Sequence, residues 1–156
     1  MIFKVEDEVV MNFNDLKPSH KDLEWINDNF KVTYLFKQFS GASWFPLMYD
    51  YSEKKMHELC KDKRLFKYRV IVDVIQKLNP KVYIPCAGPP AFLNSDIFEV
   101  NLLEENTFPT QADIYKFFEK KHPEIAKKTA VLMPEDSISS DMDIEGVTKK
   151  NLKEEC

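Results

Sequence analysis

The sequence predicts an α/β fold in which short strands alternate with longer helices. The first observation is a set of short β-branched and aromatic runs, which are typical of buried strands: residues 9–13, 32–36, 81–85 and 130–133. The second is that apolar residues between Ser52 and Leu78 recur at helical spacing. The order strand–helix–strand–helix–strand–helix–strand favours a layered architecture with crossover connections between strands.

The helices are predicted from their ends. Ser19, with an acidic residue three positions later, is a predicted N-cap for the first helix. Ser52 begins the long second helix, and Asn79 with the proline that follows it ends that helix. Thr110 or Gln111 begins a third helix, which continues to residue 121.

The composition divides the chain into a domain and a tail. Residues 1–136 contain all the aromatic residues and all the predicted strands. Residues 137–156 are polar, so we expect a flexible tail, with a frayed helix near residues 147–155.

Charge, hydropathy and cysteine usage narrow the class of protein. The net charge is -4, which argues against a nucleic-acid partner because such a partner requires a basic face. No run reaches the ~18 apolar residues of a membrane helix, and the first ten residues hold no secretory signal, so no membrane partner is expected. The three cysteines are widely spaced and form no disulfide framework or zinc motif. These features predict reduced thiols and a cytoplasmic location.

Polar residues at the predicted strand ends are the first candidates for a site. Asp15 ends the first strand, where carboxylates often face the cleft above a sheet. The alternative is a turn-forming role for Asp15 beside the first helix. After the second strand, small polar residues and an aromatic one can form a ligand wall or a packing loop: Gln38, Ser40, Ser43 and Trp44.

Other reactive residue types give weaker signals. Cys86 lies at another strand end, where it is either a ligand or nucleophile or a small buried side chain. The three histidines lack the spacing of a metal motif and are interpreted as exposed structural residues. No GxSxG nucleophile motif is present, and three glycines in the chain cannot build a phosphate-binding loop. The sequence therefore predicts an incomplete catalytic site and leaves open whether the chain is an enzyme.

Three segments together resemble a known family. They read Asn-Phe-Asn-Asp at residues 12–15, Gln-Phe-Ser-Gly-Ala-Ser-Trp-Phe-Pro at 38–46 and Ile-Pro-Cys-Ala-Gly-Pro-Pro-Ala-Phe-Leu at 84–93. Their order and spacing are similar to the metallo-β-lactamase-fold domain of CMP-N-acetylneuraminate hydroxylase-like proteins, which include Rieske iron–sulfur monooxygenases. The resemblance covers roughly residues 9–136 and implies the second half of an αββα sandwich.

The resemblance assigns roles to particular residues. Asp15 matches the aspartate that binds metal in that family, and the loops around Cys86 and Gly88 would shape the substrate cleft. The HxHxDH cluster and the paired Cys-x-His motifs of a Rieske centre are absent from the sequence. A zinc or iron site would therefore need further ligands, because one carboxylate cannot hold such a metal alone.

Two functional hypotheses follow from this resemblance. In the first, the chain is a fragment or subunit of a metal-dependent enzyme that acts on a nucleotide sugar or amino sugar, and a partner carries the missing half-domain. In the second, it is a non-catalytic remnant or interaction module that forms a homo-oligomer or binds a partner through its exposed sheet. An unrelated α/β domain is the remaining alternative.

Overall fold

A single four-stranded mixed sheet organises the chain. The computed structural model describes residues 1–41, 43–103 and 107–154. The strands follow one another across the sheet in chain order: β1 (Ile2–Val5), β2 (Glu8–Asn14), β3 (Tyr34–Gln38) and β4 (Val82–Cys86). β1 pairs with β2 in the antiparallel sense, whereas β2, β3 and β4 are parallel. The predicted α/β class is confirmed at this level.

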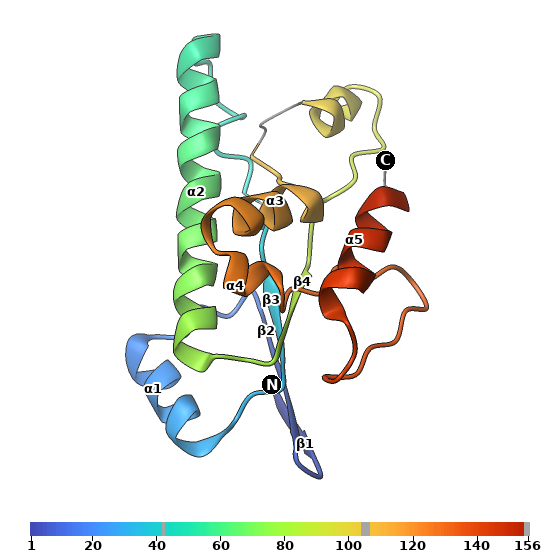
Figure 1. Ribbon diagram of the computed structural model, residues 1–156. Coiled ribbons are helices and arrows are strands. Elements are labelled where there is room, and N and C mark those ends of the chain that lie inside the picture. The colour runs from blue at the N-terminus through green and yellow to red at the C-terminus, as the bar shows by residue number, and fades with distance from the viewer. Residues whose placement is uncertain (42, 104–106, 155–156) are drawn as a thin grey trace.

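Two crossover helices connect the parallel strands. α1 (His20–Asn29) joins β2 to β3, and α2 (Glu53–Leu78) joins β3 to β4. Figure 1 shows α2 along one side of the sheet and α5 (Ile144–Glu154) along the other. Because β2, β3 and β4 run in the same direction, their carboxyl ends meet at one edge of the sheet.

The helix ends agree with the residues predicted from the sequence. Ser19 caps α1 in a reciprocal capping box with Asp22. Thr110 does the same for α3 (Gln111–Lys121) with Asp113. Ser52 precedes α2, but its side chain makes no capping hydrogen bond, so the cap predicted there is wrong. α2 ends at Leu78, and its C-cap Asn79 has the left-handed conformation, with φ 41°.

The predicted strand at residues 130–133 is wrong. Thr129 forms only an isolated bridge with Tyr83, and the backbone after Ala130 leaves the sheet. Side chains of α5 then take the place of a neighbouring strand. The Val131 N–H donates to Thr148 Oγ1 at 3.0 Å, and the Asn151 amide donates to the Val131 carbonyl at 2.9 Å.

The larger core lies between the sheet and α1, α2 and α3. Met11, Leu35 and Tyr83 point to this face from three neighbouring strands. Apolar side chains of α2 and α3 pack on them, and these include Ile75 and Phe118. The short helix α4 (Pro123–Ala126) adds two more buried side chains to the same cluster.

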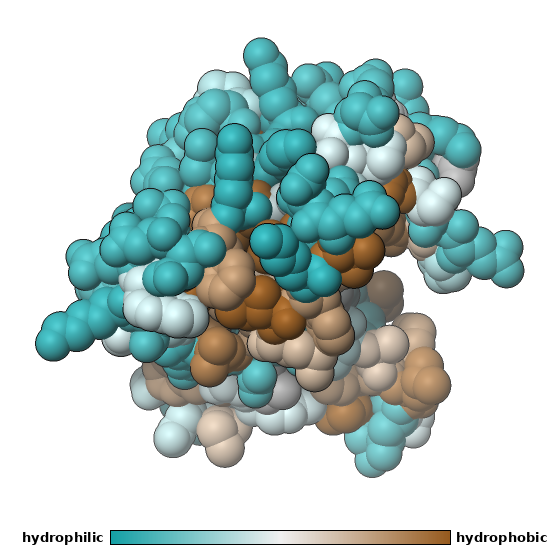
Figure 2. Space-filling view, turned by 90° about the horizontal axis from the view of Figure 1, so that it is seen from below, coloured by the Kyte–Doolittle hydropathy of each residue, from teal (hydrophilic) through white to brown (hydrophobic). Residues whose placement is uncertain are grey.

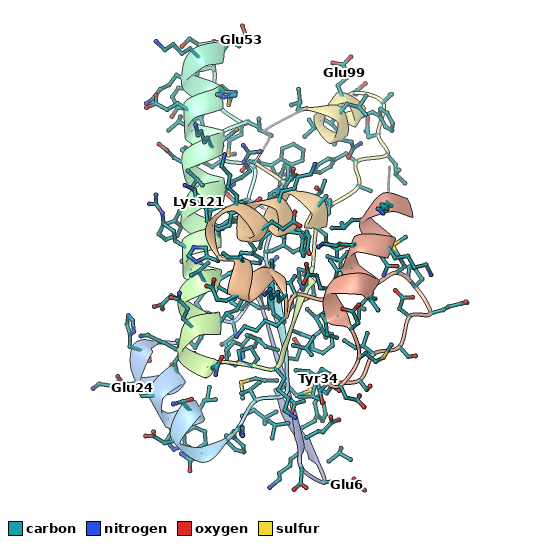
Figure 3. The ribbon with its side chains drawn as sticks, viewed as in Figure 1. Glu6, Glu24, Tyr34, Glu53, Glu99 and Lys121 are labelled. Carbon is teal, nitrogen blue, oxygen red and sulfur yellow. The ribbon has the colours of Figure 1, made fainter. Side chains whose placement is uncertain are left out.

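The opposite face of the sheet carries a smaller core. Tyr34, Val82 and Ile84 alternate with the residues of the larger core and contact Ala130 and Ile144. The Tyr34 hydroxyl donates to Glu8 Oε1 at 3.2 Å, and Figure 3 shows Tyr34 toward the end of the sheet that bears the β1–β2 turn.

The polar C-terminal segment contains more helix than expected. The helix expected near residues 147–155 is present, but it begins earlier, at Ile144, and its Thr148 and Asn151 are buried. The division of the chain after residue 136 and the flexibility of the tail stay predictions.

The surface shows an apolar edge. Ile2, Phe3 and Val5 of the edge strand β1 are all exposed. Figure 2 views the end of the molecule that bears α1 and the β1–β2 turn, and it shows apolar side chains in the middle of a hydrophilic rim. Association through an exposed edge stays a prediction. Among the described residues no helix is long and apolar enough to span a membrane, and the predicted cytoplasmic location stays a prediction.

Candidate functional site

A cleft of about 710 Å³ lies where the loops after β2 and β3 approach α2. This is the edge at which the parallel strands end, and open α/β sheets commonly bind ligands there. One wall is apolar and comes mainly from α2 through Phe66, Val70 and Ile71. Phe66 and Val70 are exposed although both are apolar, so the wall is available to a ligand.

Four lysines line this cleft. Lys17 comes from the loop after β2, Lys37 from β3, and Lys63 and Lys67 from consecutive turns of α2. The carboxylates that line it are Asp15 and Asp73. Cations therefore outnumber carboxylates in the cleft, although the chain as a whole has a net charge of -4.

Lys37 has a structural role at the base of the cleft. Its side chain is buried, and its amine donates to the carbonyl oxygens of Leu16 at 2.8 Å and Asn14 at 3.3 Å. Burial lowers the pKa of Lys37, while nearby Cys86 and Asp15 act in the opposite direction. Lys37 therefore holds the loop after β2 against β3.

Lys63 supports the loop after β3 in a similar way. Its amine donates to the carbonyl oxygens of Ser43 and Phe45, and it lies 5.9 Å from the centre of the Phe108 ring. Burial lowers the pKa of Lys63. Lys63 thus fixes the loop after β3 to α2. This is the loop whose aromatic and small polar residues were noted in the sequence.

Lys67 differs from both of these lysines. Its Nζ is buried and has no hydrogen-bond partner among the described residues. Burial, followed by the charges of Lys63 and Lys17, lowers the pKa of Lys67 to about 8. Gly41 lies directly over the amine, because a Cβ at this position would be 2.9 Å from Nζ. An unpaired buried amine is costly unless a ligand supplies the missing partner.

The cleft brings together four of the residues predicted from the sequence. Asp15, Gln38, Ser40 and Ser43 all line it. Gln38 also reaches toward the loop after β4, since its amide donates to the Ala87 carbonyl at 3.5 Å. Whether these side chains contact a substrate stays a prediction.

The other three candidates lie outside this lining. Trp44 packs against Phe92 and Phe108, with ring centroids 4.7 Å and 5.5 Å away. Gly88 touches Ser40, because a Cβ at position 88 would lie 2.3 Å from the Ser40 Cβ. Gly88 therefore permits the close approach of the loops after β3 and β4.

Cys86 is half-buried at the end of β4. Burial raises the pKa of its thiol, and the charge of Lys37 partly offsets that effect. A raised pKa keeps the thiol protonated at neutral pH, whereas nucleophiles and metal ligands require the thiolate. The environment of Cys86 therefore fits a small structural side chain at the end of β4 better than a reactive thiol.

The lysines were missed as site residues by the sequence analysis. Lys63 and Lys67 belong to a charged stretch, which was consistent with a solvated helix face. The available signal was their spacing of four residues, which places both amines on one face of α2 beside Phe66 and Val70. Sequence alone does not show that the loop after β3 covers that face.

The described residues contain no group of three or more His, Cys, Asp or Glu side chains able to hold a metal ion. Asp15 therefore lacks companion ligands within this part of the chain. A Rieske cluster requires two histidines and two cysteines. The histidines at positions 20, 57 and 122 and the cysteines at 60 and 86 do not converge, so the described residues do not fit such a cluster.

Comparison with known proteins finds relatives for part of the chain. A protein of Mycolicibacterium smegmatis, named as a Rieske 2Fe-2S iron–sulfur protein, is 30% identical over 100 residues, which are 62% of this chain and 19% of the relative. Proteins with the same type of name from two strains of Mycobacterium tuberculosis are 27% identical over 96 residues, or 61% of this chain and 18% of each relative. The chain spans about a fifth of the length of the curated relatives it matches.

No protein-family model and no solved structure matches the chain. The family expected from the sequence is wrong on these comparisons, because the relatives are named for a Rieske iron–sulfur centre and none is named for a metallo-β-lactamase fold. The same finding overturns the hydroxylase-like activity on nucleotide or amino sugars. The short segments at 12–15, 38–46 and 84–93 supported the wrong family because they contain loop and packing residues, such as Gly88, rather than a set of ligands.

Proposed function

We propose that this chain forms the ligand-binding part of a larger Rieske-related protein and that its cleft binds a small organic anion. The names of the relatives support the first half of this proposal and favour iron over zinc as the metal of the larger protein. The metal would be held outside the described residues, since these supply no ligand group.

The observation that carries the proposal is the unpaired amine of Lys67 in the cleft. A carboxylate or phosphate oxygen would give this amine a charge-assisted hydrogen bond, which is stronger than one to a neutral group. It would also restore the protonated form that burial disfavours. The amines of Lys37 and Lys63 already bind backbone carbonyls, so Lys67 is the better anchor for an anion.

The shape of the cleft indicates what accompanies the anionic group. Phe66, Val70 and Ile71 form an apolar wall beside the lysines. Binding sites of this volume are commonly apolar, with a few polar groups that fix the orientation of the ligand. The cleft therefore suits an apolar body that ends in one carboxylate or phosphate.

Titration calorimetry with three compounds of equal size tests this function. We expect 3-phenylpropionate to bind, and 3-phenylpropanol and 3-phenylpropylamine to bind at least tenfold more weakly. Binding of the anion should weaken with added salt, because salt screens its attraction to the cations that line the cleft. Equal binding of the three compounds would show that the cleft does not select anions.

Two variants locate the binding site. Lys67→Met keeps most of the length of the side chain and removes the charge, so we expect at least a tenfold loss of affinity for 3-phenylpropionate. Lys61→Met is the matched control, because Lys61 lies on the same helix, is exposed and does not line the cleft. An equal loss in both variants would indicate general attraction to α2 rather than binding in the cleft.

A further inference from the structure

The Lys67 amine has the surroundings of a nucleophile as well as those of an anion anchor. The amines of Lys37 and Lys63 are occupied by backbone carbonyls, whereas the Lys67 Nζ has no acceptor within the part of the chain that the structure describes. Its lone pair, when the amine is unprotonated, is therefore not engaged by another group of the protein. Lys67 lines a cleft of about 710 Å³, which is large enough for a small organic molecule. Its Nζ lies beneath Gly41, so a ligand has to displace that residue to reach the amine.

The electrostatic environment increases the unprotonated fraction of this amine. Desolvation and two neighbouring cations, Lys63 and Lys17, lower the pKa of Lys67 to about 8. At pH 7 roughly one Lys67 amine in ten is then unprotonated, against about one in three thousand for an ordinary lysine. Burial beside another cation is a known way to activate lysine as a nucleophile.

We propose that Lys67 forms an imine with the carbonyl group of a small 2-oxo acid bound in the cleft. This inference rests on the proposed function, because the carboxylate of the 2-oxo acid is the anion that the cleft would select. It adds to that function the position of the carbonyl group and the formation of a covalent bond at the Lys67 Nζ.

The chemistry is balanced without a redox partner. The Lys67 Nζ lone pair attacks the carbonyl carbon, and the C=O π pair moves to oxygen, which takes up a proton. The resulting carbinolamine loses one water molecule as the C=N bond forms. The sum is amine plus carbonyl compound giving imine plus water, with no change in oxidation state.

The arrangement of the cleft favours a carboxylate next to the carbonyl group. Lys17 lines the same cleft and its charge acts on Lys67, so we assign the carboxylate to Lys17 and the adjacent carbonyl group to Lys67. The apolar wall of Phe66 and Val70 would hold the rest of the molecule. A 2-oxo acid with an apolar side chain satisfies all three requirements.

Charged groups from every element around the cleft influence this amine. Carboxylates and a histidine accompany the lysines, and they come from the β2–α1 loop, α1, β3 and α2: Asp15, Lys17, His20, Lys37, Lys63 and Asp73. The positive charges outnumber the negative ones even with a neutral histidine. Among these groups the charges of Lys63 and Lys17 act in the same direction as burial and favour the unprotonated amine.

Borohydride trapping with phenylpyruvate tests the imine. The full chain is incubated with phenylpyruvate at pH 8 and reduced with sodium borohydride, and peptide mass mapping then locates the secondary amine. We expect one adduct, on Lys67, favoured over a lysine with the ordinary pKa on the order of 100-fold because of the difference in unprotonated amine. The yield should rise with pH with a midpoint near 8. Adducts spread evenly over the surface lysines would overturn the proposal.

The Lys67→Arg variant separates covalent chemistry from binding. Arginine keeps the positive charge but stays protonated and cannot form an imine. We expect this variant to form no adduct with phenylpyruvate. Its affinity for phenyllactate, the 2-hydroxy analogue, is measured in parallel, so that loss of the adduct can be compared with any loss of binding. Lys61→Met should form the adduct normally.

The outcomes distinguish the two proposals. If the wild type binds phenyllactate but yields no adduct with phenylpyruvate, the imine is overturned and the anion-binding function stands. If the wild type binds neither compound, the anion-binding function fails together with the imine. If an adduct forms on Lys67 but the cleft does not select anions, the proposal that Lys67 is a nucleophile stands and the anion-binding function is overturned.

Discussion

The two faces of the sheet are covered in different ways. On the first face, α1, α2 and α3 bury a large apolar cluster that includes Leu35 and Ile75. On the second, α5 and the preceding segment cover a small cluster around Val82, and buried hydrogen bonds from Thr148 and Asn151 complete the contact. The first face is stabilised mainly by removing apolar surface from water, whereas the second depends on exact pairing of polar groups.

This difference explains which parts of the fold can be predicted from the composition of the sequence. Apolar residues at helical spacing identify a helix that covers a hydrophobic face, and α2 shows this pattern clearly. A segment that binds through hydroxyl and amide groups has the composition of a flexible tail. The stability of the two faces should therefore respond differently to substitution, and four experiments test this difference.

The largest effect is expected from the first face. Ile75 has an exposed fraction of 0%, so Ile75→Ala leaves a cavity in the larger core. We expect a loss of about 3 kcal/mol in the free energy of unfolding, measured by urea denaturation. Val70→Ala on the same helix is the control, because Val70 is 39% exposed and should cost less than about 1 kcal/mol. Similar losses in the two variants would contradict the assignment of the core.

A smaller but diagnostic effect is expected from the second face. The buried Thr148 hydroxyl accepts from the Val131 N–H at 3.0 Å and donates to the Thr129 carbonyl at 2.7 Å. Thr148→Val keeps the shape and leaves both backbone groups unpaired, so we expect a loss of about 2 kcal/mol. Hydrogen exchange should show early loss of protection in residues 131–153 while α2 stays protected.

Thr148→Ser is the matched control for this prediction. It retains the hydroxyl and removes one methyl group, which costs about 1 kcal/mol or less. A Thr148→Val protein as stable as the wild type would favour the flexible tail predicted from the sequence over the docked α5.

The third effect concerns the cleft that borders the first face. The pKa of Lys67 is about 8 in the folded chain and near 10.5 when unfolded, so the unfolded chain binds more protons between these values. The contribution of Lys67 to the free energy of unfolding therefore rises as the pH increases from about 8 to 10.5. Below pH 8 the cost of burying the charged Lys67 amine is fully present. Lys67→Met removes that penalty, so we expect a gain of roughly 1 kcal/mol below pH 8 after discounting for solvent screening.

The difference between Lys67→Met and the wild type is the quantity to follow by urea denaturation across pH 7 to 10.5. Other groups with shifted pKa values, such as Tyr68 and Lys37, are present in both proteins and cancel in that difference. The gain should disappear toward pH 10.5. A gain that does not vary with pH would indicate better packing by methionine rather than removal of a buried charge.

Most of the first face could be predicted from the sequence. The spacing of apolar residues predicted α2, the pair Ser19–Asp22 predicted the start of α1, and α3 was expected to begin at Thr110 or Gln111, because each signal is local. The strand predicted at residues 130–133 failed for a non-local reason. Its backbone groups are bonded by side chains of α5, and no local pattern identifies such a partner.

The sequence analysis placed its candidate residues at strand ends, and four of them line the cleft: Asp15, Gln38, Ser40 and Ser43. Their functional role stays a prediction. The lysines were not recognised because a lysine on a helix has the same local signature whether it is solvated or buried under a loop. Only the fold places Gly41 over the Lys67 amine and creates the lowered pKa.

The smallest effects are expected from the helix caps, and they extend the comparison to the ends of the helices. Ser19 caps α1 on the first face, and Asp143 accepts from the Gly146 N–H at 3.0 Å at the start of α5 on the second. We expect Ser19→Ala and Asp143→Ala each to cost about 0.5 to 1 kcal/mol. Ser52→Ala is the control, because the Ser52 side chain makes no capping hydrogen bond and its loss should change little.

The two cap variants should differ in where the chain opens rather than in how much stability it loses. A cap lost from α1 weakens a helix that packs on the larger core, so that core retains most of its contacts. A cap lost from α5 weakens the helix that carries Thr148 and Asn151, whose hydrogen bonds need a fixed backbone. Hydrogen exchange should therefore spread from α5 to Val131 in Asp143→Ala but stay within α1 in Ser19→Ala. The same local pattern in both variants would mean that the second face does not depend on polar pairing.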